Sequence, residues 1–132
     1  MTHSPPDDVP GRVPGADRAI VRGEKIAYLL DERRRVRGDP RARAAYKAGI
    51  FSVVLGFTDS GLLRDRLLAH VRGHRPVDVV RDPDHGLTKY VVEGPLRGQN
   101  GRSIGMRTIW GVYDADATRT LLSAYPSKSR PV

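Results

Sequence analysis

The chain has 132 residues, of which 39% are hydrophobic and 29% charged, with a formal net charge of +8 and no cysteine. Its length suits one folded domain, and no stretch approaches the roughly 18 apolar residues of a membrane helix. The lack of cysteine excludes disulfide bonds, thiolate metal ligands and cysteine nucleophiles, whereas the positive charge favours a polyanionic partner such as nucleic acid.

Residues 1–18 are expected to form a flexible arm, because their prolines and glycines prevent a helix and little of the segment is apolar. The segment lacks the basic and apolar regions of a secretory signal, so we expect a cytoplasmic site of action. We expect a single domain over residues 19–126 and a short basic tail over residues 127–132.

Three helices are predicted in the first half of the chain. The first begins at Glu24, and the second runs from the start signal Asp39-Pro40 to about Leu55. The third follows the capping residues 58–60 and ends near Gly73, with apolar residues recurring at helical spacing.

The period then changes to two, which predicts four strands at residues 77–81, 87–93, 103–113 and 118–125. The second of these strands is expected to end at Gly94-Pro95, and Trp110 on the third is expected to lie in the core. Helices followed by a meander predict an α+β domain, with helices packed on one face of an antiparallel sheet.

Common cofactor and nucleophile motifs are absent, since there is no Walker A loop, no G-x-G-x-x-G opening a helix and no G-x-S-x-G elbow. His70 and His74 have the spacing of a metal pair, but no third ligand is evident, and surface histidines at a helix end are the simpler interpretation. We therefore expect neither a cofactor nor a metal ion.

The strand region carries residues suited to RNA cleavage without a metal. That reaction needs a base for the 2′-hydroxyl, an acid for the leaving oxygen and donors for the phosphate. The candidate catalytic residues are His85, Lys89, Glu93, Arg107 and Tyr125, with Thr108, Arg119 and Ser123 as donors on neighbouring strands. The alternative is the ordinary polar face of a half-exposed sheet.

Several segments resemble a family of small bacterial and phage-associated domains of unknown function. They read K-I-A-Y-L-L (25–30), K-A-G-I-F (47–51), L-G-F-T (55–58), T-K-Y-V-V-E-G-P-L (88–96), G-R (101–102), R-T-I-W (107–110) and S-A-Y-P (123–126). The helices-then-meander order and the closing strand also resemble the barnase–EndoU–colicin–RelE group of metal-independent ribonuclease toxins.

The second resemblance implies RNA as the substrate, cyclic phosphate chemistry and a cognate antitoxin or immunity protein. The positions that match the family pattern are Lys47, Lys89, Arg107, Thr108 and Tyr125, whereas His85 lies in a turn where the family varies. Lys47 and Arg102 thereby join the candidate phosphate-binding residues. An Arg-rich stretch at residues 32–43 is an insertion that binds RNA or a partner, or is a solvated loop.

Two functions follow as hypotheses. In a ribonuclease toxin, Arg107 and Lys89 would hold the scissile phosphate, and His85 or Glu93 would be the base. Tyr125 or Lys47 would then assist the leaving group or the phosphate. The alternative is a non-catalytic basic module that binds nucleic acid or an acidic protein in a phage or toxin–antitoxin system. An accessory structural role in such a system is the third hypothesis.

Overall fold

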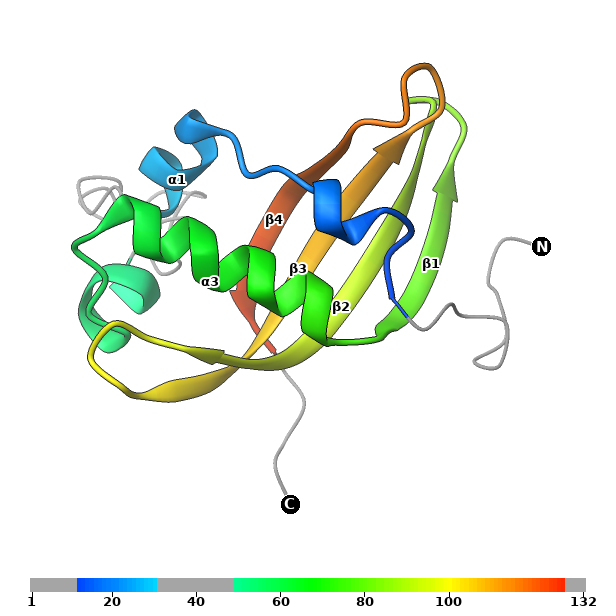
Figure 1. Cartoon of the computed structure of the whole chain (residues 1–132). Helices are drawn as coiled ribbons and strands as arrows, with labels where there is room; N and C mark the ends of the chain where they lie inside the picture. The colour runs from blue at the N-terminus through cyan, green and yellow to red at the C-terminus, as the bar shows by residue number, and fades with distance from the viewer. Residues whose placement is uncertain (1–11, 31–48, 128–132) are drawn as a thin grey trace, which may run out of the picture.

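The computed structural model describes residues 12–30 and 49–127 (Figure 1). The elements are η2 (Ala16–Arg18), α1 (Gly23–Leu30), η4 (Ile50–Val54), α3 (Ser60–Gly73), β1 (Pro76–Asp82), β2 (Leu87–Arg97), β3 (Ser103–Tyr113) and β4 (Arg119–Pro126). Most of the second predicted helix, the 32–43 insertion and Lys47 lie outside these residues.

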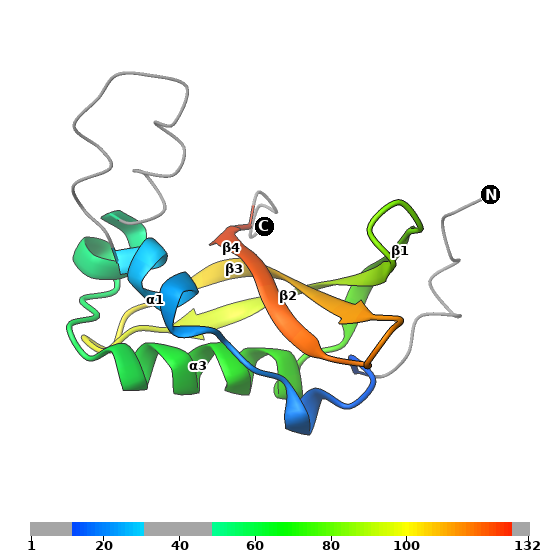
Figure 2. The same ribbon diagram turned by 90° about the horizontal axis from the view of Figure 1, so that it is seen from above.

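The four strands form one antiparallel sheet in the order β1-β2-β3-β4, which confirms the predicted α+β fold. β2 and β3 pair along their whole length, from Leu87 opposite Tyr113 to Arg97 opposite Ser103. Figure 2 shows α3 lying along one face of this sheet, while the other face carries none of the described helices. We call that second face the open face.

α3 was predicted correctly because its signals are local. The Asp59 side chain caps the helix by accepting a hydrogen bond from the Leu62 N–H at 3.1 Å. Leu63, Leu67 and Val71 follow at intervals of four residues and are completely buried. Burying each such side chain contributes about 1.5–3 kcal/mol, so this face holds α3 on the sheet.

The core lies between α3 and the sheet. Even-numbered residues of β2 and β3 point into it, including the buried Val92, Leu96, Met106 and Trp110. The expectation that Trp110 is a core residue is therefore confirmed. The odd-numbered residues of the same two strands point to the open face, and this alternation decides which polar residues share a site.

The amino-terminal segment is folded from Val13 onward, so the expected flexible arm is wrong for residues 13–18. Val13 and Ala16 are buried in the core, and Ile20 forms a parallel bridge with Thr120 beside β4. The segment thus covers the outer edge of β4. Its prolines rule out a long helix but not an extended chain with one short turn of helix.

The second predicted helix ends near Leu55 as expected, but its last turn is not an α-helix, and one strand boundary differs from the prediction. η4 is a π-helix in which the Leu55 N–H bonds the Ile50 carbonyl, and Gly56 ends it with a φ of 69°. β2 does not end at Gly94-Pro95 but continues to Arg97. The pairing between β1 and β2 extends only as far as Val92, so Pro95 lies beyond the edge of β1. Pro95 is tolerated because β1 does not need the N–H that proline lacks.

Candidate functional site

Three of the predicted catalytic residues form one row across the open face. Glu93 on β2 lies directly opposite Arg107 on β3, which lies directly opposite Tyr125 on β4. Directly opposed residues in an antiparallel pair have their Cβ atoms about 4.5–5.5 Å apart, so the three side chains are neighbours. We call this set the Glu93–Arg107–Tyr125 row.

Arg107 is the centre of the row and is bonded on both sides. Its Nε donates to Glu93 Oε2 at 2.6 Å, and a terminal nitrogen pairs with the same oxygen. Partial burial lowers the pKa of Arg107, but hydrogen bonds to Glu93 and Tyr125 outweigh this and raise it overall. The guanidinium is therefore a permanent cation, and 39% of its side chain remains exposed to solvent.

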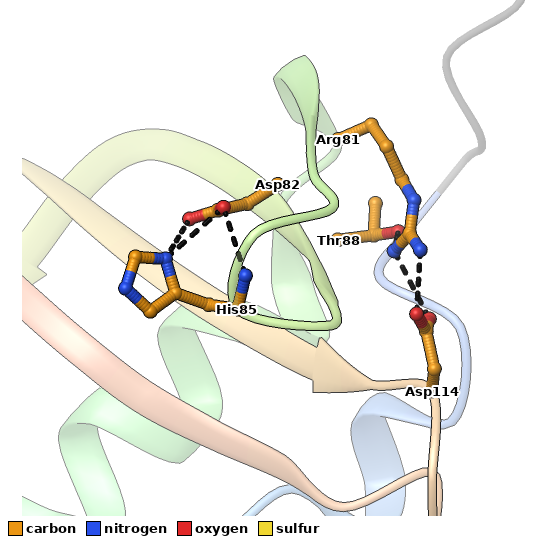
Figure 3. A network of polar contacts seen from close by, with 5 residues as sticks. All are labelled: Arg81, Asp82, His85, Thr88 and Asp114. Atoms are coloured by element: carbon orange, nitrogen blue, oxygen red, sulfur yellow. Dashed lines mark hydrogen bonds and ion pairs between the residues drawn. The ribbon is translucent and has the colours of Figure 1, made fainter.

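The other two predicted catalytic residues, His85 in the β1–β2 turn and Lys89 near the start of β2, share a carboxylate. His85 Nδ1 lies 3.0 Å from Asp82 Oδ2, as Figure 3 shows, and Lys89 Nζ lies 3.4 Å from the same oxygen. The hydrogen bond from His85 lowers the pKa of Asp82, and Lys89 adds to this effect. Asp82 was not among the residues predicted from the sequence, although its spacing of three from His85 is the signal of a turn contact.

The two groups are separate sites. Lys89 and Glu93 are four residues apart on β2, which places their Cα atoms about 13 Å apart at 3.3 Å per residue. Val91 on β2 and Ile109 on β3 pair between them. One phosphate therefore cannot contact both Lys89 and the Glu93–Arg107–Tyr125 row at short range.

Next to His85, a further ion pair joins the two turns at this end of the sheet. Arg81 donates to both carboxylate oxygens of Asp114, at 3.0 and 2.5 Å, and its Nη1 lies 3.4 Å from the Thr88 hydroxyl (Figure 3). The hydrogen bond to Asp114 raises the pKa of Arg81. This fork-to-fork geometry ties the β1–β2 and β3–β4 turns together.

Two of the predicted phosphate-binding residues do not lie on the open face. Thr108 is completely buried, and its hydroxyl bonds Trp110 Nε1 at 2.8 Å and His70 Nδ1 at 3.0 Å. Arg119 donates to the carbonyls of Pro14 and Ala117, both at 2.6 Å. Their polar groups hold the core and the amino-terminal segment, so we withdraw both as phosphate ligands.

The remaining candidates are placed as follows. Ser123 pairs with Ile109 on the open face, in the row next to Tyr125. Arg102 is exposed in the β2–β3 turn, close to the end of the same face. Both positions are compatible with a role beside the Glu93–Arg107–Tyr125 row.

The interpretation of His70 as a surface histidine is wrong. The side chain is 2% exposed, and Nε2 lies 3.0 Å from the Gly94 carbonyl, so both ring nitrogens have partners. Burial lowers the pKa of His70. Within residues 12–30 and 49–127, no group of three or more His, Cys, Asp and Glu side chains is placed to hold a metal ion.

Fold and site together define a small α+β domain with a carboxylate, a guanidinium and a phenol aligned on the sheet face that carries none of the described helices. Residues 12–128 match the family described as "Domain of unknown function (DUF6883)", and the chain belongs to that family. No curated protein sequence matches the chain. None of the described helices is long and apolar enough to cross a membrane.

A solved structure shares the fold. It is one chain of the "Contact-dependent growth inhibition toxin - immunity protein complex from Klebsiella pneumoniae 342", with a TM-score of 0.63 and 14% sequence identity. The alignment covers 89% of this chain and 100% of that chain. At this identity the likeness establishes a common fold.

Proposed function

We propose that this protein is a metal-independent ribonuclease toxin whose reaction centre is the Glu93–Arg107–Tyr125 row. The observation that carries the proposal is the register that brings these three side chains together on the open face. A carboxylate, a guanidinium and a phenol supply a base, a phosphate ligand and a proton donor. The excess of positive charge, +8 in total, favours approach of an RNA substrate.

The reaction follows from the order of the groups along the row. Glu93 removes the proton from a ribose 2′-hydroxyl, and the 2′-oxygen attacks the adjacent phosphorus. The bond from phosphorus to the 5′-oxygen breaks, and Tyr125 gives its proton to that leaving oxygen. Arg107, between them, donates hydrogen bonds to the phosphate oxygens as negative charge develops. The products are a 2′,3′-cyclic phosphate and a 5′-hydroxyl end.

The roles proposed for the remaining candidates become more limited. Lys89 and His85 are about 13 Å or more from the row along β2, so we assign them to flanking contacts rather than to the scissile phosphate. His85 is the alternative base only if the reaction centre lies at the β1–β2 turn. Ser123 lies next to Tyr125 on the open face, and we assign it a contact to the ribose or base.

A neutralising partner protein belongs to the proposal. The complex that contains the similar chain is described as a toxin with its immunity protein. A toxin that cleaves RNA requires such a partner in the cell that makes it, and an acidic protein would complement the basic chain. We propose that the partner covers the open face and so blocks the row.

The second candidate is a non-catalytic binding module. It is favoured by the mutual pairing of Glu93 and Arg107, because an opposite-charge pair across two strands also stabilises a sheet without any catalytic role. This module would bind nucleic acid or an acidic protein through the same basic surface. Its binding would weaken as salt rises, while RNA would stay intact.

The test is incubation of purified protein with total RNA in the presence of EDTA. We expect fragments that end in 2′,3′-cyclic phosphate, and slowed growth when the protein is expressed without a partner. Intact RNA together with normal growth would contradict the ribonuclease proposal. Intact RNA together with salt-sensitive binding would support the binding module instead.

A further inference from the structure

The β2–β3 hairpin extends beyond both outer strands. The first pair between β1 and β2 is Pro76 with Val92, and the last pair between β3 and β4 is Met106 with Pro126. Residues 95–105 therefore lie outside the four-stranded part of the sheet. We call them the hairpin arm; Figure 1 shows it running alongside the start of α3.

The tip of the arm is fixed to the helical layer. Gln99 Oε1 accepts hydrogen bonds from the backbone N–H groups of Thr58 and Asp59, at 3.0 and 3.1 Å. Asn100 Nδ2 donates to the Val54 carbonyl at 3.0 Å. The side-chain amides of Gln99 and Asn100 are thus bonded to the backbone between η4 and α3, and these bonds hold the arm in one position.

The hairpin arm carries an excess of positive charge. Arg97 and Arg102 are both exposed, and residues 94–106 contain no aspartate or glutamate. Among the described residues, neither guanidinium has a carboxylate or carbonyl partner. Four other cations on or beside the sheet differ, since carboxylates pair with Arg81, Lys89 and Arg107 and a carbonyl binds Arg119.

The position of Arg97 places this charge beside the candidate reaction centre. Arg97 alternates in phase with Glu93 and so lies on the open face, about 13 Å further along β2. Pro95 and Gly105 are paired with each other and lie between Arg97 and the Glu93–Arg107–Tyr125 row. Neither has a long side chain that would project from the sheet. A flexible polyanion that contacts Arg107 can therefore continue along the sheet to Arg97 without meeting a bulky side chain of residues 12–30 or 49–127; the described residue beside this path is the small Ser127.

The opposite direction along the open face is less favourable for a polyanion. There the cation Lys89 is already paired with Asp82. Asp78 on β1 pairs opposite Val91 and adds a second carboxylate to that part of the face. The electrostatic difference between the two ends gives a substrate on the open face a preferred direction.

We infer that the hairpin arm is an RNA-backbone binding site, in which Arg97 and Arg102 contact phosphates on one side of the scissile bond. The inference rests on the proposed function for the position of that bond. Arginine suits this role because its planar fork donates two hydrogen bonds to one phosphate. The substrate is a single strand that runs from the Glu93–Arg107–Tyr125 row toward the arm.

The test measures binding separately from cleavage. The probe is a fluorescein-labelled 2′-O-methyl RNA of about twelve nucleotides, a length within the usual range of single-strand sites, whose blocked 2′-oxygens prevent cleavage. The variant is R97Q/R102Q in the full chain. The matched control is R18Q/R22Q, which removes the same charge from two exposed arginines on η2 and just before α1. Circular dichroism confirms that both variants are folded.

We expect R97Q/R102Q to bind about tenfold more weakly at low salt. The slope of log affinity against log salt should fall by about 1.4, since each phosphate contact to a single strand contributes about 0.7. R18Q/R22Q should keep the slope of the wild type. Equal losses in the two variants, or no binding by the wild type, would overturn the inference. In another outcome, the wild type also binds polyglutamate as tightly as RNA, and R97Q/R102Q loses that binding. This result would overturn the inference, because the ligand of the arm would then be an acidic protein.

The same proteins with unmodified RNA separate this inference from the proposed function. If the wild type binds the blocked RNA through the arm but does not cut unmodified RNA, the ribonuclease proposal fails and the arm stands. If it cuts RNA and R97Q/R102Q binds like the wild type, the arm fails and the ribonuclease proposal stands.

Discussion

The Thr108 hydroxyl on β3 donates a hydrogen bond to His70 Nδ1 on α3, at 3.0 Å. The direction follows from the neighbouring contacts. His70 Nε2 faces the Gly94 carbonyl, which can only accept, so Nε2 carries the proton and Nδ1 is the acceptor. The Thr108 oxygen in turn accepts from Trp110 Nε1 at 2.8 Å. A buried chain of hydrogen bonds therefore joins the helix to two strands.

Replacing Thr108 with valine should destabilise the protein by about 2–4 kcal/mol. The change keeps the shape of the side chain but leaves Trp110 Nε1 and His70 Nδ1 buried without partners, at about 1–3 kcal/mol each. Urea unfolding monitored by tryptophan fluorescence measures the difference. The control is Thr88→Val, whose hydroxyl is 3.4 Å from exposed Arg81 and should matter by less than about 1 kcal/mol. Equal losses of stability in the two variants would show that the buried chain of hydrogen bonds does not stabilise the protein more than an exposed contact does.

Stability should fall as the pH drops below the ordinary histidine value of 6.5. Burial lowers the pKa of His70 in the folded protein, so the unfolded chain binds a proton at a higher pH than the folded one. This stabilising contribution is fully present above pH 6.5 and is lost as the pH falls toward the lowered pKa of the folded state. Urea unfolding at pH 7.5 and 5.5 measures the loss. In His70→Gln the difference should shrink, and an unchanged difference would contradict the assignment.

The features that could be predicted from the sequence are those that depend on neighbouring residues. The cap and spacing of α3 act within a few residues, and strand alternation already placed Thr108 on the same face as Trp110. Applied consistently, that alternation excludes Thr108 from the open face. Asp82 was also within reach, because its contact to His85 spans three residues of a turn.

Long-range contacts could not be predicted in the same way. Arg119 binds the Pro14 carbonyl across 105 residues of sequence, and no local pattern distinguishes that arginine from one that faces solvent. The pairing of Glu93 with Arg107 depends on the register of the β2–β3 hairpin. A shift of one residue would move one of the two side chains to the core face.

Gly98→Ala should release the hairpin arm from the helical layer. A Cβ at this position would lie 2.5 Å from the Leu55 carbonyl oxygen, which is backbone and cannot rotate away. The arm or η4 must shift, at a cost of about 1–3 kcal/mol in the free energy of unfolding. Gly23→Ala, which meets nothing within 4 Å, is the control and should not destabilise. Hydrogen exchange of the Thr58 and Asp59 amides, which bond Gln99, reports the release directly.

Arg107→Ala should lower RNA cleavage by about 100-fold or more, the usual effect of removing one donor to a developing charge. Its stability should change by less than about 1 kcal/mol, because partly exposed ion pairs contribute little. The matched control is Arg81→Ala, which removes a similarly exposed arginine from its ion pair with Asp114. The control should cleave like the wild type. Equal cleavage by both variants would remove Arg107 from the reaction centre.

The identity of the base is decided by comparing Glu93→Gln with His85→Gln. The carboxylate of Glu93 touches Arg107, the proposed phosphate ligand, whereas His85 lies beyond Lys89 at the other end of the open face. We expect Glu93→Gln to lower the cleavage rate by about 100-fold or more and His85→Gln to change it by about twofold at most. The reverse result, with Asp82→Asn as inactive as His85→Gln, would move the reaction centre to the β1–β2 turn. Asp82 would then be the residue that positions the imidazole, as the carboxylate does in other aspartate–histidine pairs.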